Sequence, residues 1–305
     1  MYKILITGGT GLIGMRLSAL LQSQGYEVRH LSRRARKDAT FPAYAWDVER
    51  QQLDADALDG VQAVIHLAGE GIADQRWTAK RRTQILDSRT QSSALLARAI
   101  AENSHRHQIK TVVCASAIGY YGDTADNIVD ETAPAGSDFM AEVCRAWEAS
   151  SQPLRALSLR CPVARIGIVL STQGGALAKM LPSYRLRIGT YFGNGRQFYS
   201  WIHIDDACRA LQFCLENPQA VGTYNLVAPE AVSNYDLARA IASAMDKKCL
   251  LLPVPRFALS LALGEMSSVV TTSTRVAPAA LLRDGFQFQH ADLLPALRDL
   301  VVGGK

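Results

Sequence analysis

The sequence predicts an α/β fold: a Rossmann-like doubly wound parallel sheet, joined by a second, smaller α+β substrate domain. Short apolar runs alternate with helical segments over residues 1–166, a glycine-rich turn follows the first run, and this rhythm stops near Gly167. Continuous apolar runs between helices are typical of parallel strands buried on both faces. The 305 residues, 48% hydrophobic and 20% charged, fit a globular protein of one large or two modest domains.

The elements follow in order from these patterns. The expected strands lie at residues 3–7, 27–33, 44–46, 63–69, 110–116, 160–165 and 223–227. Helical periodicity predicts helices over residues 12–25, 78–102, 139–152 and 233–245. Gly25 should end the first helix, Ser233 should cap the last, and Pro153 should end or kink the third.

The domain boundary is expected at residue 166. Residues 1–166 form the predicted nucleotide-binding domain, and residues 167–305 form the smaller domain, with 250–305 as its C-terminal region. The strand at 223–227 and the helix at 233–245 are expected to return to the first domain or to its border.

Composition excludes several classes of protein. The net charge of +5 is mild, and the basic clusters at 33–37 and 80–82 have no interleaved aromatic residues, so we expect no nucleic-acid partner. No apolar run reaches the ~20 residues that cross a bilayer, and the chain opens directly into a strand, which leaves no signal peptide. The six cysteines form no C-x-x-C pair. We expect a cytoplasmic protein with reduced, buried thiols, no membrane contact and no metal site.

A glycine motif follows the first strand. "TGGTGLIG" (7–14) places Gly8, Gly11 and Gly14 between a strand and a helix. In this context Gly8 permits the tight turn, Gly11 lets the backbone approach a pyrophosphate, and Gly14 lets the helix pack closely. The motif predicts a dinucleotide cofactor, against the alternative of a generic glycine-rich turn.

The end of the second strand selects between the two dinucleotides. "HLSRRARK" presents Ser32, Arg33 and Arg34 and no acid. A carboxylate there would hold the ribose 2′-hydroxyl of NAD, whereas guanidinium groups and a hydroxyl suit a 2′-phosphate. We therefore predict NADP(H), with a solvated basic loop as the alternative.

The motifs resemble those of the extended short-chain dehydrogenase/reductases. The glycine spacing, "HLAG", "ASAIGYYGD" and "WIHIDD" carry this resemblance. "AGEGIADQRWTAKRRTQILDSR", "GGALAKMLPSYRLRIG", "GNGRQFYSWIHIDD" and "LLRDGFQF" narrow it to the YfcH-type epimerase-like family, whose members carry a small C-terminal domain of unknown function. Some members have been labelled cell-division-inhibitor-like.

The resemblance implies further cofactor contacts. It places Thr10, Gly11, Leu12 and Ile13 along the pyrophosphate, and Leu67, Ala68 and Gly69 beside the adenine ribose. Arg89 stands where related epimerases have Asn, and it is expected to help hold the cofactor. A surface salt bridge is the alternative role for Arg89.

The catalytic pair of the superfamily is missing. Its members place Tyr-x-x-x-Lys on one helix, with a nearby Ser or Thr that polarises the carbonyl. None of the ten tyrosines here is followed by Lys four residues on. The two places fall on Met140 and Cys144, or, one residue earlier, on Phe139 and Val143.

Three residues after the fifth strand remain as catalytic candidates: Ser116, Tyr120 and Tyr121. The two tyrosines would equally serve as a pocket wall. Other polar residues are expected to line a substrate pocket: Glu70, Arg76, Arg165, Arg196, Gln197, Trp201 and His203. Buried ion pairs are the alternative for the first three and a structural hydrogen bond for His203, while Asp205 is expected to cap the helix that follows.

Two functions from different classes agree with these patterns. One is an NADP(H)-dependent oxidoreductase or epimerase-like enzyme that acts on a small polar substrate with an unusual proton donor. The other is a non-catalytic NADP(H)-binding sensor that reports the state of the cofactor to a protein partner.

Overall fold

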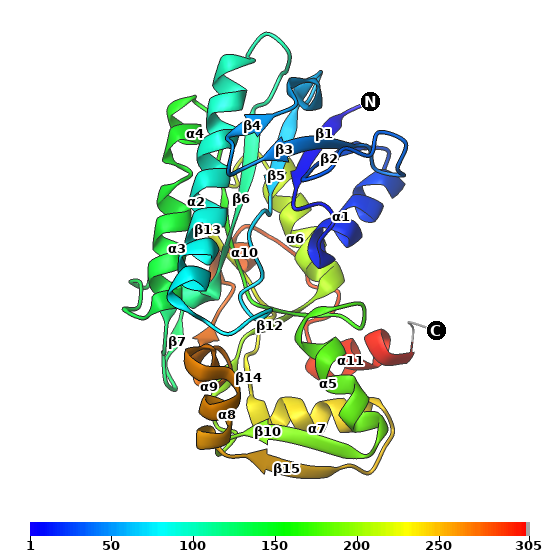
Figure 1. Ribbon diagram of the computed structural model, residues 1–305. Helices are drawn as coiled ribbons and strands as arrows, with labels where there is room; N and C mark the ends of the chain where they lie inside the picture. Colours follow the sequence, from blue (N-terminus) through cyan, green and yellow to red (C-terminus); the bar gives the residue numbers. More distant parts are fainter. Residues whose placement is uncertain (303–305) are drawn as a thin grey trace.

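An eight-stranded sheet forms the centre of the molecule (Figure 1). The computed structural model describes residues 1–302. The strand order is β13-β8-β6-β5-β1-β2-β3-β4, and the pairs are parallel except for β3 with β4. The strands are β1 Lys3–Thr7, β2 Glu27–Ser32, β3 Ala43–Asp47, β4 Gln52–Leu53, β5 Ala63–His66, β6 Thr111–Ala117, β8 Val163–Ile166 and β13 Thr223–Leu226. The predicted doubly wound sheet is confirmed.

The direction of winding reverses at β1. The chain runs from β1 to β2 on one side and returns to β5 on the other. In open parallel sheets such a reversal leaves a crevice beyond the carboxyl ends of the two central strands, and nucleotides bind there. The crevice of this protein therefore lies after Thr7 and His66.

Helices cover both faces of the sheet (Figure 1). One face carries α1 Leu12–Ser23 and α6 Ile204–Glu216, and the other carries α2 Ala79–Glu102, α3 Phe139–Ala149 and α4 Gln152–Ala156. The single helix expected over 139–152 is instead two helices, because Pro153 lies in the first turn of α4, where a missing N–H costs no hydrogen bond. Helix α1 ends at Ser23, and Gly25 follows with a φ of 87°.

The second half of the chain contributes to both ends of the molecule. Its strand β13 pairs with β8, and its helix α6 packs on α1. Helix α7 (Asn234–Ala244) packs against β10 and α11 rather than on the large sheet. The remaining elements of this half are β9 Ile168–Leu170, α5 Gly175–Arg185, β10 Ile188–Phe192, β11 Phe198–Tyr199, β12 Trp201–His203, β14 Val232–Ser233, β15 Leu250–Val254, α8 Arg256–Leu263, α9 Ser268–Thr271, β16 Arg275–Val276, α10 Ala279–Arg283 and α11 Leu293–Val302.

Short elements join these layers, and one apolar core runs through them. The 3-10 turns are η1 Ala55–Leu58, η2 Ile118–Tyr121 and η3 Gly264–Ser267, and the short strand β7 (Ile128–Val129) pairs with β16. The largest core cluster contains Ile4 and Ile65 of the sheet together with Leu237 of α7 and Leu297 of α11. The two halves therefore share a continuous interior. No helix within residues 1–302 is long and apolar enough to cross a membrane.

Candidate cofactor site and active site

The glycine turn packs tightly at the head of the crevice. Gly8 has a φ of 67°, and a Cβ atom there would lie 2.9 Å from the carbonyl oxygen of Leu67 in the loop after β5. A Cβ at Gly14 would lie 2.4 Å from the carbonyl oxygen of Gly8. Both positions require glycine, because contacts of this length do not occur for real Cβ atoms. The backbone of the turn is thereby left open at Thr10 and Gly11, which are exposed.

A buried histidine joins the two strands that border the crevice. The Nδ1 atom of His66 lies 2.7 Å from the Thr7 hydroxyl, and its Nε2 atom lies 3.1 Å from the Ser93 hydroxyl. The Ala68 amide donates to the Thr7 hydroxyl oxygen at 3.1 Å. Burial lowers the pKa of His66 to about 4, so the ring is neutral near pH 7. This network fixes the Leu67–Gly69 loop relative to the glycine turn.

The predicted 2′-phosphate residues lie at the carboxyl end of β2. Ser32 is the last residue of that strand and is partly exposed, while Arg33 and Arg34 are exposed. Neither arginine forms an ion pair with another residue of the described chain. Two free guanidinium groups at this edge can meet a phosphate.

Sequence reasoning missed a second histidine beneath the turn. The Nε2 atom of His30 lies 2.7 Å from the Ser18 hydroxyl of α1, and the ring packs against Gly9, where a Cβ would come within 2.4 Å of it. Burial lowers the pKa of His30 to about 4. His30 therefore holds α1 onto β2, a role that only its alternation within an apolar strand could have suggested.

Arg89 is a buried cation beside the loop after β5. Its side chain is 8% exposed, and it donates to the carbonyl oxygens of Ile85 (2.9 Å) and Glu70 (3.1 Å). The guanidinium lies 4.7 Å from the ring centroid of Trp147, and a Cβ at Gly69 would lie 3.2 Å from its Cζ. Burial lowers the pKa of Arg89. No carboxylate of residues 1–302 pairs with it, so the alternative role of a surface salt bridge is not the one found, and the charge faces the crevice loop.

The helix that should carry the catalytic pair presents Met140 and Cys144 instead. A Cβ at Gly119, in the turn after β6, would lie 3.3 Å from Cβ of Met140 and 3.7 Å from Sγ of Cys144. Val143 is fully buried, and Phe139 packs on Trp77 with ring centroids 5.0 Å apart. The structure thus selects the first of the two registers. Burial raises the pKa of Cys144 to about 11, so this thiol is not a base near neutral pH.

Ser116 and Arg165 are joined to a carboxylate that sequence reasoning left unassigned. Glu148 of α3 receives hydrogen bonds from Ser116 Oγ (2.7 Å), Arg165 Nε (2.8 Å) and Arg165 Nη2 (2.9 Å). Arg165 is 4% exposed. Burial opposes its charge, but the hydrogen bonds and charge of Glu148 outweigh that effect and raise the pKa of the guanidinium. Arg165 therefore forms a buried ion pair with Glu148, which was the alternative to a place in the substrate pocket.

The two tyrosines after β6 differ in their environment. The Tyr121 hydroxyl donates to Asn225 Oδ1 (2.7 Å) and accepts from Arg165 Nη1 (2.9 Å), and burial raises its pKa to about 12. Tyr120 is partly exposed, and the Arg165 guanidinium lies 3.3 Å from its ring centroid. The Tyr121 hydroxyl is therefore fully hydrogen-bonded within the protein, whereas the Tyr120 ring stacks on the Arg165 guanidinium.

Glu70 and Arg76 also have partners within the protein. Glu70 accepts a hydrogen bond from Arg81 at 3.2 Å. Arg76 donates to the carbonyl oxygens of Leu261 and Ala262, at the end of α8. Arg76 thus holds the C-terminal region against the loop after β5.

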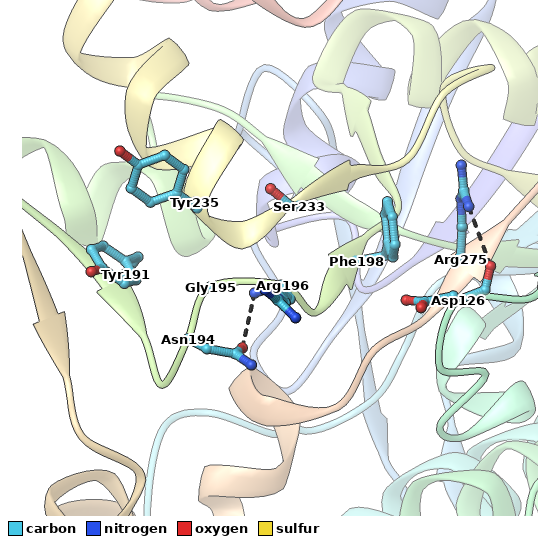
Figure 2. Close-up of a pocket in the computed structure, with 9 residues that line it drawn as sticks. All are labelled: Asp126, Tyr191, Asn194, Gly195, Arg196, Phe198, Ser233, Tyr235 and Arg275. Carbon is cyan, nitrogen blue, oxygen red and sulfur yellow. Dashed lines mark hydrogen bonds between the residues drawn. The ribbon is translucent and has the colours of Figure 1, made fainter.

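The four residues expected from "GNGRQFYSWIHIDD" separate into two groups. Arg196 is exposed and lines a cavity of about 680 Å³ with Tyr191, Tyr235, Phe198 and Arg275 (Figure 2). Gln197 and Trp201 are buried and donate to backbone carbonyls, Gln197 to Phe192 and Val270, Trp201 to Glu230. These two side chains stabilise the loop by hydrogen bonds and do not line the cavity.

Asp205, which the sequence predicts as the N-cap of α6, does not cap that helix. Helix α6 is capped by His203, whose Nδ1 accepts the Asp205 amide at 3.1 Å. Asp205 instead forms a bidentate pair with Arg16 of α1, at 2.5 and 2.8 Å. His203, Asp205 and His290 lie close enough to share a metal ion. However, Nδ1 of His203 is occupied by the amide, so Nε2 carries the proton and points toward Asp299 at 3.3 Å.

Fold, glycine turn and crevice define the class: a dinucleotide-binding protein of the short-chain dehydrogenase/reductase type. Residues 4–227 match the family model described as "NAD dependent epimerase/dehydratase family", and residues 254–300 match a "Domain of unknown function (DUF1731)". The chain therefore belongs to the NAD dependent epimerase/dehydratase family. The resemblance to epimerase-like proteins with a small C-terminal domain is confirmed.

Relatives match along almost the entire chain. The mouse epimerase family protein SDR39U1 is 34% identical over 98% of this chain and 99% of its own. Epimerase family protein YfhF of Bacillus subtilis is 34% identical over 99% of both chains. Among solved structures, human SDR39U1 (isoform 2) with NADPH superposes with a TM-score of 0.89, at 31% identity, over 98% of this chain and 99% of that one.

Proposed function

We propose that the protein binds NADPH in the crevice between β1 and β5. Four features support this: the glycine turn that admits no Cβ, the exposed residues Thr10 and Gly11, the free arginines after β2, and the buried Arg89. The pyrophosphate would lie at the start of α1, beside Leu12 and Ile13. Ser32, Arg33 and Arg34 would hold the 2′-phosphate, and Leu67–Gly69 would border the adenine ribose. The similar human SDR39U1 was crystallised with NADPH.

Calorimetric titration of NADPH and NADH tests this proposal. NADPH should bind more tightly, and Arg33→Glu should weaken NADPH far more than NADH, because a carboxylate repels the 2′-phosphate. Arg239→Glu, an exposed site on α7, is the matched control. If NADH binds as tightly as NADPH, or if both affinities fall alike, the role assigned to Arg33 is wrong.

For the chemistry, the site supports an NADPH-dependent, epimerase-like oxidoreductase that works without the Tyr/Lys pair. The observation that carries this proposal is Tyr120, which is partly exposed and stacked on the Arg165 cation. Its hydroxyl would donate a proton to a small polar substrate, with Ser116 and Tyr121 positioning the network beneath it. The cavity at Arg196 (Figure 2) would then receive the distal part of the substrate.

A second candidate is a non-catalytic NADPH sensor that reports to a protein partner. The same network favours it, because Ser116 and Tyr121 are both committed to partners, and Met140 and Cys144 replace the acid and the base. The loop before α5 lies on Leu12, where a Cβ at Gly174 would approach within 3.3 Å, so cofactor binding at the glycine turn can reach the second half of the chain.

Purified protein incubated with NADPH and a panel of carbonyl compounds separates the two candidates. An enzyme should consume NADPH with at least one compound, and Tyr120→Phe should lower that rate while leaving NADPH affinity unchanged. Tyr44→Phe, a tyrosine on β3, is the control. Tight NADPH binding without hydride loss across the panel would favour the sensor.

We further propose a reducing, cytoplasmic environment. All six cysteines are free, and five are buried. The location of a tagged full-length protein in intact cells tests this directly.

A further inference from the structure

An exposed apolar face lies at the end of the molecule opposite β4. It belongs to the two-stranded parallel sheet of β10 and β15, with Ile188 paired to Leu250 and Thr190 to Leu252 (Figure 1). Ile188, Leu250 and Leu252 of these strands are 40%, 64% and 41% exposed, and Leu186, which follows α5 just before β10, is 76% exposed. We call these four residues the ribbon patch.

The alternation along both strands explains the exposure. Gly189 and Leu251 lie between the exposed residues and point inward: Leu251 packs on the main core, and a Cβ at Gly189 would come within 2.5 Å of it. Helix α7 covers that inner side. Successive side chains of a strand point to opposite faces, so Ile188, Leu250 and Leu252 lie on the uncovered face. Several large aliphatic side chains on one uncovered face are unlike the single apolar residues found scattered on ordinary surfaces.

The ribbon patch is surrounded by positive charge. Residues 185–188 and 246–256 contain Arg185, Arg187, Lys247, Lys248 and Arg256, against one acid, Asp246. None of these cations is in an ion pair with a carboxylate of residues 1–302. Arg185 and Lys247 are adjacent, since the Lys247 ammonium donates to the Arg185 carbonyl oxygen at 3.1 Å. These two segments, which contain the ribbon patch, therefore carry five cations against one acid.

Helix α8 also exposes large apolar side chains. It follows β15 directly, and its Phe257 and Leu261, one turn apart, are 75% and 78% exposed. Arg76 donates to the carbonyl oxygens of Leu261 and Ala262, which ties α8 to the loop after β5. The apolar side chains are thus presented by ordered elements.

Although the sequence predicts no membrane contact, we propose that this end of the protein docks on an anionic lipid surface. Exposed apolar side chains can enter the boundary between head groups and acyl chains, while the lysines and arginines beside them stay at the level of the phosphates. A second copy of the chain fits less well, since a symmetric contact would bring the same cations together. An acidic protein would use the charges but would leave the aliphatic side chains without a matched surface.

Vesicle co-sedimentation of the full-length protein tests the proposal. The protein should sediment with phosphatidylcholine vesicles that contain phosphatidylglycerol and remain in solution with phosphatidylcholine alone. Binding should weaken as salt is added, because the attraction to the anionic surface is screened. Absence of binding to the anionic vesicles, or equal binding to both kinds, overturns the proposal.

Two independent variants locate the contact. Leu250→Ser/Leu252→Ser should lower the partition coefficient by about tenfold for each leucine, and Arg185→Gln/Lys248→Gln by about fivefold for each charge. Leu282→Ser, an exposed leucine on α10, should leave binding unchanged. Thermal melting confirms that each variant is folded. Wild-type binding by both double variants would refute the assignment to this face.

The alternative occupants give different results. If analytical ultracentrifugation without vesicles shows a dimer that Leu250→Ser/Leu252→Ser abolishes, and vesicles do not bind, the face is a contact between two copies. If the protein binds polyglutamate but not vesicles, the charges serve an acidic partner. Either result overturns the lipid proposal.

Discussion

Replacing Glu148 with Gln should strongly destabilise the protein. Glu148 is the counter-ion of Arg165, which is 4% exposed and is held by two hydrogen bonds to the carboxylate. Glu148→Gln leaves that guanidinium charge buried without an anion. Removing one partner of a buried ion pair costs about 3–5 kcal/mol. Because the Glu148 side chain is 16% exposed and Gln keeps one acceptor oxygen, we expect about 3 kcal/mol.

Urea denaturation at pH 7, followed by far-UV circular dichroism, measures this loss of unfolding free energy. Glu142→Gln, an exposed carboxylate on the same helix, is the matched control and should change stability by less than about 0.5 kcal/mol. Arg165→Met added to Glu148→Gln should recover part of the loss, since the unpaired charge is then gone. A loss below about 1 kcal/mol for Glu148→Gln, as for an exposed pair, would refute the reasoning.

Three further predictions concern the crevice. Burial lowers the pKa values of His30 and His66 from 6.5 to about 4 in the folded protein, so the unfolded chain takes up protons first as the pH falls below 6.5. The free energy of unfolding should therefore drop by about 2 kcal/mol per histidine between pH 7 and pH 5. Urea midpoints at the two pH values measure this drop, and equal midpoints would contradict it. Gly14→Ala should abolish measurable NADPH binding in calorimetry, because its Cβ would meet the Gly8 carbonyl oxygen at 2.4 Å; near wild-type affinity would exclude that packing. Arg89→Met should weaken NADPH at least tenfold and leave unfolding by urea within about 1 kcal/mol, since it removes a buried cation that has no acid partner; a large loss of stability with unchanged affinity would make Arg89 structural.

The features that sequence predicted best are those determined by residues close together in the chain. The glycine turn, the apolar strands and the cap at Ser233, which accepts the Asp236 amide, all depend on residues a few positions apart. The order of the glycines between a strand and a helix was enough to locate the crevice, because a parallel strand followed by a helix has few ways to pack.

Long-range partners were beyond sequence reasoning. Tyr121 and Asn225 are 104 residues apart and Glu148 and Arg165 are 17 apart, and nothing in a strand or helix pattern indicates that they meet. The cap of α6 was assigned to Asp205 because Asp favours that position, but the pair with Arg16, 189 residues away, holds it elsewhere. Burial of Gln197 and Trp201 likewise depends on segments distant in the chain.

The edge strand β13 has a consequence for the order in which the protein is made. Residues 223–226 complete the large sheet beside β8, so a ribosome must translate 226 of the 305 residues before the last strand is available. Until then β8 offers an unpaired edge to other nascent chains. The growing polypeptide is therefore exposed to misassembly from the completion of β8 at Ile166 until β13 is complete at Leu226, and slow translation between residues 166 and 223 would prolong that interval.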